Sequence, residues 1–416
     1  MFSPLRKPAR GLASSLALAL SLAGGAAVGT AVFAPSAYAQ DYSKEFVAVY
    51  QPAANLTQGE APDFNAAKAQ IAAVEAAAKT ADDRYAAGNF MLIVGNKLED
   101  RGLQRRGLES MLASGKVEPE RVGQFQSFVG NIAYDAGDYL GARNALEAAV
   151  AAGYDDPNMR GLIVETFYKQ EDFAGGVAYT MNLVQEVESA GGQVPEQWLL
   201  RALQSSYDAG LVKESTDVSL ALLERFPTTK NWVNATQVIG AVGNFDTQAE
   251  LDLLRLMRIS GALQQPNEFT RYIENADPRI MSNEVEDVLA AGLAAGVFSS
   301  GDTYYVDVKS VVDQRKGSDA AEVGAFMRDA DSGAGKDALN AADVLYSLDR
   351  FADAEKYYAM AAEKGGVDTA TALTRKGIAQ VQQGKYAEAQ ATFGEISGAR
   401  APLASLWSAY AQSKAG

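Results

Sequence analysis

The chain has 416 residues, a formal net charge of −15 and neither cysteine nor histidine. So acidic a chain is a poor partner for nucleic acid, because the phosphate backbone repels it. The two missing residue types exclude disulfides, Ser-His-Asp triads, Cys-His nucleophiles and ordinary zinc sites. We therefore expect no catalytic residue, no metal and no cofactor.

Residues 1–39 have the layout of a secretory signal peptide. A basic end precedes an apolar run from Leu12 to Val32, and Ala37-Tyr38-Ala39 places small residues at positions minus three and minus one. We expect cleavage before Gln40 and a periplasmic address in a bacterial cell envelope, or secretion. The alternative is an uncleaved membrane anchor, because the run approaches the length of a bilayer span. No later apolar stretch reaches that length, so the mature chain is not expected to cross a membrane.

Residues 40–80 are expected to form an N-terminal helical cap. Its alanine-rich part runs from Asp63, which can serve as an N-cap, to Thr80 and has high helix propensity. Helical hairpins are expected beyond it, since Gly, Pro and Asp signals such as Phe226-Pro227 separate segments that have almost no strand-type alternation.

A large apolar anchor residue recurs along the rest of the chain. Tyr139 and Phe173 are 34 residues apart, and the segments that lead to them, from Val129 and from Ile163, have the same pattern. Later anchors stand at Leu211, Phe245, Phe351 and Tyr386. A period of this length is typical of stacked helical hairpins.

Two parts of the array are less regular. An early copy, Val94-Gly95-Asn96 followed by Asp100 and Gly102, repeats Val129-Gly130-Asn131 with Asp135 and Gly137 at a spacing of 35, which places the start of the array near residue 81. No anchor stands near positions 280 or 316, so residues 263–336 are expected to be degenerate repeats.

The segment 129–149 resembles a tetratricopeptide repeat, and the run Ala354–Gly365 is similar to the related Sel1 subclass. Asn131 and Gly137 match the consensus of the first helix, while Ala142, Leu146 and Ala149 match the packing positions of the second. The resemblance implies an all-α, right-handed α-solenoid of stacked antiparallel helical hairpins, with an N-terminal array at 81–262 and C-terminal repeats with a capping helix at 337–416. The expected structural positions are Gly130, Gly137, Tyr139, Ala142, Phe173, Trp198, Leu211, Trp232, Phe245, Phe351, Ala354, Tyr386 and Ala389.

The same resemblance implies a concave groove lined by first-helix residues four, five and eight positions before each anchor. The candidate groove residues are Asn131, Tyr134, Asp135, Glu165, Tyr168, Lys169, Tyr207, Gln237 and Tyr346. Tyrosine is common at binding centres, because it combines a large contact area with a polar tip. The alternative is that these rings pack as core.

Other chemical motifs are weak. Gly335-Lys336 is followed by Asp337 where a phosphate loop needs Ser or Thr, and the loop 329–334 has Ala334 where a calcium loop needs glycine. Glu109 can be read as a peptidoglycan-cutting glutamate, or as part of a solvated helix face. The basic residues Lys97, Arg101, Arg105 and Arg106 form either an anion-binding patch or an ordinary solvated face.

We therefore expect an exported, non-enzymatic scaffold or adaptor that binds other envelope proteins or peptides. Two alternatives remain: a peptidoglycan-active or peptidoglycan-binding protein built on a helical superstructure, and a helical-repeat protein that binds a solute or glycan.

Overall fold

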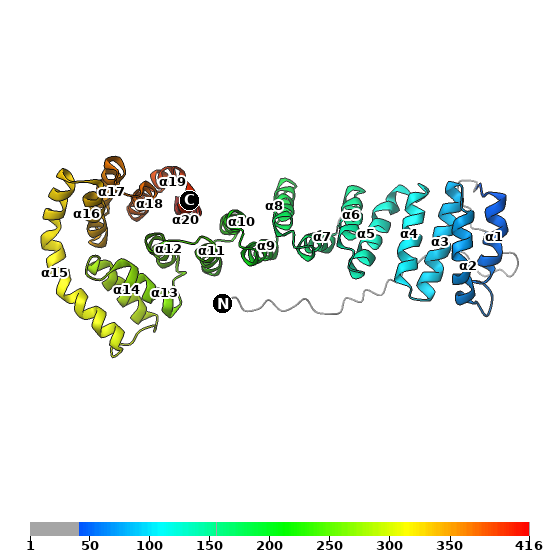
Figure 1. Ribbon diagram of the computed structural model, residues 1–416, viewed down its shortest axis with the longest axis horizontal. Helices are drawn as coiled ribbons and strands as arrows, with labels where there is room; N and C mark the ends of the chain where they lie inside the picture. Colours follow the sequence, from blue (N-terminus) through cyan, green and yellow to red (C-terminus); the bar gives the residue numbers. More distant parts are fainter. Residues whose placement is uncertain (1–40, 155, 416) are drawn as a thin grey trace.

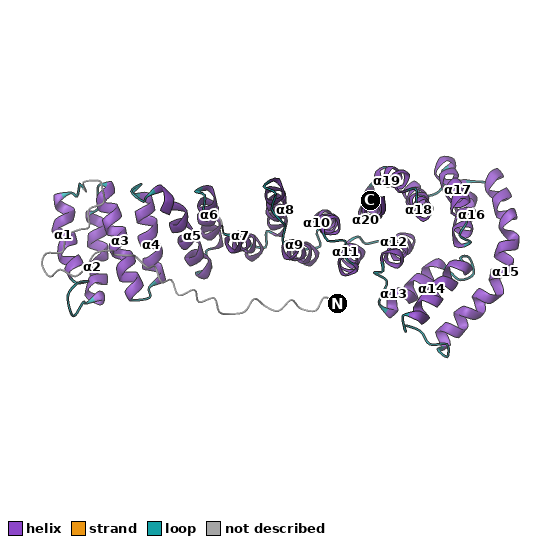
Figure 2. Ribbon diagram, turned by 180° about the vertical axis from the view of Figure 1, so that it is seen from behind, coloured by secondary structure: helices purple, strands orange, loops and turns teal. Residues whose placement is uncertain are grey.

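The computed structural model describes residues 41–154 and 156–415, and every regular element in these residues is a helix (Figure 2). The expected signal peptide lies outside the described residues. None of the described helices is both long and apolar enough to cross a bilayer. The α-helices are α1 (Lys44–Asn55), α2 (Phe64–Ala77), α3 (Ala81–Lys97), α4 (Arg101–Ala113), α5 (Pro119–Asp135), α6 (Tyr139–Ala151), α7 (Pro157–Lys169), α8 (Phe173–Ser189), α9 (Glu196–Asp208), α10 (Val212–Arg225), α11 (Thr229–Val242), α12 (Thr247–Ser260), α13 (Pro266–Ala276), α14 (Ser282–Ala294), α15 (Thr303–Ser332), α16 (Gly335–Ser347), α17 (Phe351–Lys364), α18 (Thr369–Gln382), α19 (Tyr386–Gly394) and α20 (Ala401–Ala415), with a 3-10 turn η1 (Gly398–Arg400) before the last.

Consecutive helices pack against each other along the chain, which confirms the predicted α-solenoid of antiparallel hairpins (Figure 1). The anchors mark where second helices begin. Tyr139, Phe173, Phe351 and Tyr386 are the first residues of α6, α8, α17 and α19, Leu211 is the N-cap of α10, and Phe245 directly precedes the N-cap of α12. The division into segments 81–262, 263–336 and 337–416 stays a prediction.

The structure shows why the repeat pattern has glycine at two positions. Gly137 in the turn between α5 and α6 has φ 79°, a left-handed conformation that disfavours side chains. Gly130 lies where α5 and α6 cross, and a Cβ there would approach Leu146 Cγ to 2.5 Å. In other turns, Glu99 and Glu171 adopt the left-handed conformation without being glycine.

The predicted register of the early repeat is wrong by three residues. Asp100 is the N-cap of α4, where its carboxylate accepts a bond from the Leu103 N–H at 3.0 Å, so it corresponds to Asp138 and not to Asp135. Gly102 lies inside α4 and makes no turn. The glycines of this hairpin serve packing instead: a Cβ on Gly88 would lie 2.6 Å from the Gly107 carbonyl oxygen, so α3 and α4 approach closely.

The segment without anchors contains one hairpin and one long helix. Met281, the N-cap of α14, is 5% exposed and stands where the anchor near 280 was sought. The next expected anchor is absent because α15 runs through position 316 without a turn. Helix α15 has 30 residues and packs against α14 and α16. Its C-terminal end is capped by Lys364, whose Nζ donates to the carbonyl oxygens of Ala330, Asp331 and Gly333 at 2.6, 3.0 and 2.9 Å.

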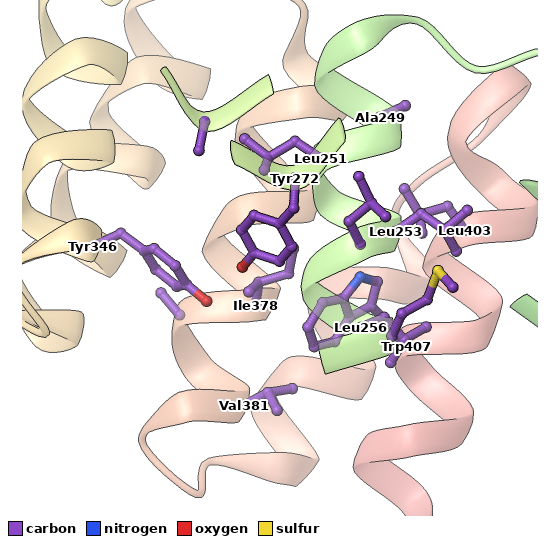
Figure 3. Packing of buried hydrophobic residues seen from close by; sticks show 14 of the residues in the cluster. Ala249, Leu251, Leu253, Leu256, Tyr272, Tyr346, Ile378, Val381, Leu403 and Trp407 are labelled. Atoms are coloured by element: carbon purple, nitrogen blue, oxygen red, sulfur yellow. The ribbon is translucent and has the colours of Figure 1, made fainter. Parts of the chain in front are cut away.

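The C-terminal half folds back on itself, whereas α1–α9 extend in an open row (Figure 1). Helix α20 packs against α10, α11 and α12. Trp407 Nε1 donates to the Asp252 carbonyl oxygen at 3.0 Å, and the Tyr410 hydroxyl donates to the Ile259 carbonyl oxygen at 3.3 Å. Around this contact, one continuous apolar core runs from Leu223 in α10 to Ala411 in α20 (Figure 3).

A buried network of ion pairs stabilises the C-terminal closure, the contact of α20 and its neighbours with α10–α12. The Asp252 carboxylate of α12 is fully buried and accepts from Arg255 at 3.0 Å, from Arg375 of α18 at 3.2 Å and from Arg400 of η1 at 2.7 Å. Arg255 also pairs with Glu284 of α14 at 2.8 Å. These contacts connect elements more than a hundred residues apart in sequence, so they specify the closed arrangement as well as satisfying each charge.

Asp343 of α16 completes the network. It accepts from Arg375 Nη1 at 2.7 Å and from the Tyr358 hydroxyl at 2.7 Å. The surrounding arginines hold the pKa of Asp252 below its usual value despite burial, which alone would raise it. The Asp252 carboxylate is thus ionised at neutral pH.

Candidate binding groove on α9 and α11–α13

A groove of about 1140 Å³ lies between α9, α11, α12 and α13. This volume is slightly above the usual range for small-molecule sites, about 300 to 1,000 Å³. Leu253, Leu254 and Met257 of α12 form an apolar floor, and Tyr207 and Phe245 add aromatic surface. The groove therefore offers apolar area together with an open, solvent-facing mouth.

Side-chain amides are the groove's most frequent polar groups, and each first helix contributes one or two. They are Gln204 of α9, Asn234 and Gln237 of α11, and Gln265 and Asn267 at the start of α13. Gln237 Nε2 is 3.3 Å from Glu268 Oε1, and Gln204 Nε2 is 2.7 Å from Asp208 Oδ1. Each of these two bonds uses one amide N–H, and an amide also has a second N–H and a carbonyl oxygen.

The acidic groups of the groove are engaged within the protein. Glu250 accepts from Arg271 Nη1 at 2.5 Å and from Asn275 Nδ2 at 3.1 Å, which joins α12 to α13. The Glu268 carboxylate caps α13, because it accepts from the backbone N–H groups of Gln264 and Gln265, both at 2.9 Å. With Lys230 and Arg271 as its basic residues, the lining carries two charges of each sign. The groove is therefore electrically balanced in an acidic protein.

Two of the predicted groove residues, Tyr207 and Gln237, line this groove. Tyr134 and Glu165 lie on neighbouring first helices, α5 and α7. The Tyr134 pKa is raised by burial and by the charge of Glu165. Glu165 in turn pairs with Arg201 of α9 at 2.9 Å. Asn131, Asp135 and Lys169 are exposed.

Two other predicted groove residues are core residues, which corrects the groove prediction. Tyr168 is 7% exposed and packs on Gly176 of α8, where a Cβ would approach the ring to 2.4 Å. Tyr346 is 3% exposed, and the Arg255 guanidinium lies 4.4 Å from its ring centre. Burial raises the pKa of both phenols. The next helix covers the ring of Tyr168 and Arg255 of α12 covers that of Tyr346, so the core alternative is correct at both positions.

The weaker motifs have structural roles. Glu109 pairs with Arg105 at 2.7 Å on α4, and Arg105 also reaches Asp138 at 2.8 Å. Arg106 pairs with Glu75 of α2. These contacts favour the solvated-face reading of the basic cluster. Gly335 begins α16 and is required there, because a Cβ would lie 2.1 Å from the Gly365 carbonyl oxygen. No group of three metal-ligating side chains occurs in the part of the chain that the structure describes.

The sequence analysis missed most of the groove's polar residues. Gln204 and Asn234 stand on first helices, but seven and eleven residues before their anchors rather than four, five or eight. Glu250 and Arg271 belong to α12 and α13, where no family position was applied. The recurrence of an amide on successive first helices was the available signal.

No protein-family model matches this chain, and no curated protein matches it in sequence. Among solved structures, the chain is similar to Naa15/Naa10 bound to HypK-THB, with a TM-score of 0.31 and 11% identity over 87% of this chain and 65% of that one. It is also similar to yeast Tom70, with a TM-score of 0.22 and 11% identity over 89% of this chain and 96% of that one. The chain thus spans just under two thirds of the length of the first of these. The assignment to the α-solenoid fold rests on the helix pairing described above.

Proposed function

We propose that this protein is a non-enzymatic adaptor whose groove on α9 and α11–α13 binds an extended segment of a partner polypeptide. The observation that carries the proposal is the combination of an apolar floor with amides on three successive first helices. An amide side chain has the same donor and acceptor groups as a peptide bond, so it can pair with a main chain whatever its sequence.

The spacing of the helices fits such a ligand. Packed helices lie about 8 to 10 Å apart. A polyproline-type chain rises about 3.1 Å per residue and repeats every three residues, or about 9 Å. Helices α9 and α11 contact each other, so an extended segment that crosses them would present equivalent main-chain groups to Gln204 and Gln237.

The charge balance of the lining indicates what the side chains of the partner contribute. Glu250 and Arg271 neutralise each other, and Glu268 is occupied by its helix cap. Apolar partner side chains would then supply most of the affinity by leaving water for the floor of Leu253, Leu254 and Met257, which is itself already buried. Each fully buried aliphatic side chain is worth about 1.5 to 3 kcal/mol.

We further propose that the protein works outside the cytoplasm, in the bacterial cell envelope, with envelope proteins as partners. The support is the signal-like pattern of residues 1–39. Mass spectrometry of the chain recovered from its own cells tests the proposal. A mature N-terminus at Gln40 supports export, and an intact N-terminus in the cytoplasmic fraction contradicts it.

The binding proposal is tested with peptides selected from a random 12-residue display library against the purified chain. Peptides that bind the groove should lose at least tenfold in affinity when Tyr207→Ala and Gln237→Ala are combined. The matched control is Lys97→Ala on the exposed surface of α3, which should leave the affinity unchanged. If no peptide is selected but a glycan array gives a ligand that needs Tyr207 and Gln237, the polypeptide proposal is wrong.

A further inference from the structure

Helix α7 is joined to α6 through the smallest of the apolar clusters in the described residues. We call α1–α6 the arm and α8–α20 the body. The core that joins α6 to α7 has four buried apolar residues among those described: Leu146, Ala149, Met159 and Ile163. The core that joins α1 to α4, inside the arm, has eleven, including Phe46, Phe90 and Met91. Since each buried aliphatic side chain contributes about 1.5 to 3 kcal/mol, so small a cluster gives the joint between α6 and α7 little apolar stabilisation.

Apart from ring contacts such as Phe167 with Tyr179 of α8, at 5.7 Å between ring centres, polar contacts join α7 to its neighbours on both sides. Toward α6, the Arg143 guanidinium lies 3.5 Å from the Phe167 ring centre. Toward α9, Glu165 pairs with Arg201 across side chains that are 33% and 43% exposed. Ion pairs with this exposure contribute about 0 to 1 kcal/mol, so they hold an orientation without fixing it.

The backbone of α7 is also soft. Gly161 lies inside the helix, and a Cβ placed on it would meet no atom within 4 Å, so packing does not require glycine there. Glycine in a helix interior costs about 0.5 to 1 kcal/mol relative to alanine. The turn that follows α7 contains Glu171, which is left-handed at φ 59°. These backbone features lower the local stability of α7 where its apolar cluster with α6 is small.

We propose that α7 is a hinge about which the arm swings relative to the body, and that this motion opens and closes the concave face beside the groove. Helix α9 connects the hinge to the groove. Its Arg201 faces the hinge through Glu165, and three residues later Gln204 lines the groove. The Glu165–Arg201 pair marks the closed limit of the swing, and its rupture lets the arm move away. Figure 1 shows α7 between the stacked arm and the rest of the solenoid.

Because the chain has no cysteine, pairs of introduced cysteines can be spin-labelled and their distances measured by double electron-electron resonance. Labels at Leu140→Cys in α6 and Gln197→Cys in α9 report across the hinge. The control pairs are Gln70→Cys with Leu140→Cys inside the arm and Gln197→Cys with Asp307→Cys inside the body; all four side chains are exposed. The distance distribution across the hinge should be at least twice as wide as in either control pair.

A stiffening variant identifies the hinge element. Gly161→Ala should narrow the distribution across the hinge, because it raises the helix propensity of α7 without a clash. Gly324→Ala in α15, where the nearest atom to a Cβ would be 3.6 Å away, is the matched control and should leave it unchanged. A distribution across the hinge as narrow as the controls overturns the proposal, as does an equal effect of the two alanine variants. No groove ligand is involved, so the outcome is independent of the proposed binding function.

Discussion

The buried carboxylate of Asp252 gives the sharpest stability prediction. In Asp252→Ala, Arg255 keeps Glu284 at 2.8 Å and Arg375 keeps Asp343 at 2.7 Å. Arg400 loses its only close acid, because its remaining carboxylates lie 3.6 Å away on exposed residues. A buried charge left without its partner typically costs about 3 to 5 kcal/mol. We therefore expect the free energy of unfolding of the C-terminal half to fall by about that amount.

The assay is urea unfolding followed by the fluorescence of Trp232 and Trp407, both of which lie in the affected core. Asp217→Ala is the matched control, because it removes an exposed pair with Lys213 and should leave the free energy of unfolding almost unchanged. Combining Asp252→Asn with Arg400→Met should recover part of the loss, since it removes the unpaired charge. A loss below about 1 kcal/mol for Asp252→Ala would refute the view that this network holds the C-terminal closure.

Three further predictions concern stability, each measured by urea unfolding. Gly130→Ala should destabilise the chain by about 1 to 3 kcal/mol through the clash between α5 and α6, and a neutral result would contradict the close crossing. Glu99→Gly should raise the free energy of unfolding by about 0.5 to 1 kcal/mol, because glycine relieves a left-handed turn. Glu109→Gly inside α4 should lower it, and a change of the same sign in both variants would disprove this account. The pKa values of Asp252 and Glu284 are lowered on folding. The stability that these two carboxylates contribute is therefore present above their unfolded pKa values, 3.8 and 4.5, and is lost as pH falls through their folded pKa values. The urea midpoint should drop steeply below about pH 4, and less steeply in Asp252→Asn.

The hairpins could be predicted from sequence because their determinants are local and periodic. An anchor such as Tyr139, preceded by a turn glycine, marks the hairpin that runs from Pro119 to Ala151. The register failed at Asp100, because an N-cap and a helix-ending aspartate look alike in one sequence. The continuous helix α15 also lacked a positive signal, since a missing anchor does not distinguish a drifted turn from an absent one.

The C-terminal closure and the groove depend on contacts between distant residues, which the repeat period in the sequence does not predict. Asp252, Arg375 and Arg400 stand in helical sequence where charged residues usually face solvent, and only folding brings them together. Tyr346 was misplaced for the same reason, because the arginine that covers it comes from α12, far away in sequence. The groove was predicted at Tyr207 and Gln237, where the repeat is regular, and missed at Arg271, where it is not.

The central claim is that the groove on α9 and α11–α13 binds an extended polypeptide. Its most direct test is the affinity of a selected peptide, measured by calorimetry, for the unaltered chain and for the Tyr207→Ala and Gln237→Ala double variant, with circular dichroism as the check of folding. The account predicts a loss of at least tenfold in a variant that keeps its helical spectrum. Equal affinity of the two chains for every selected peptide would contradict it.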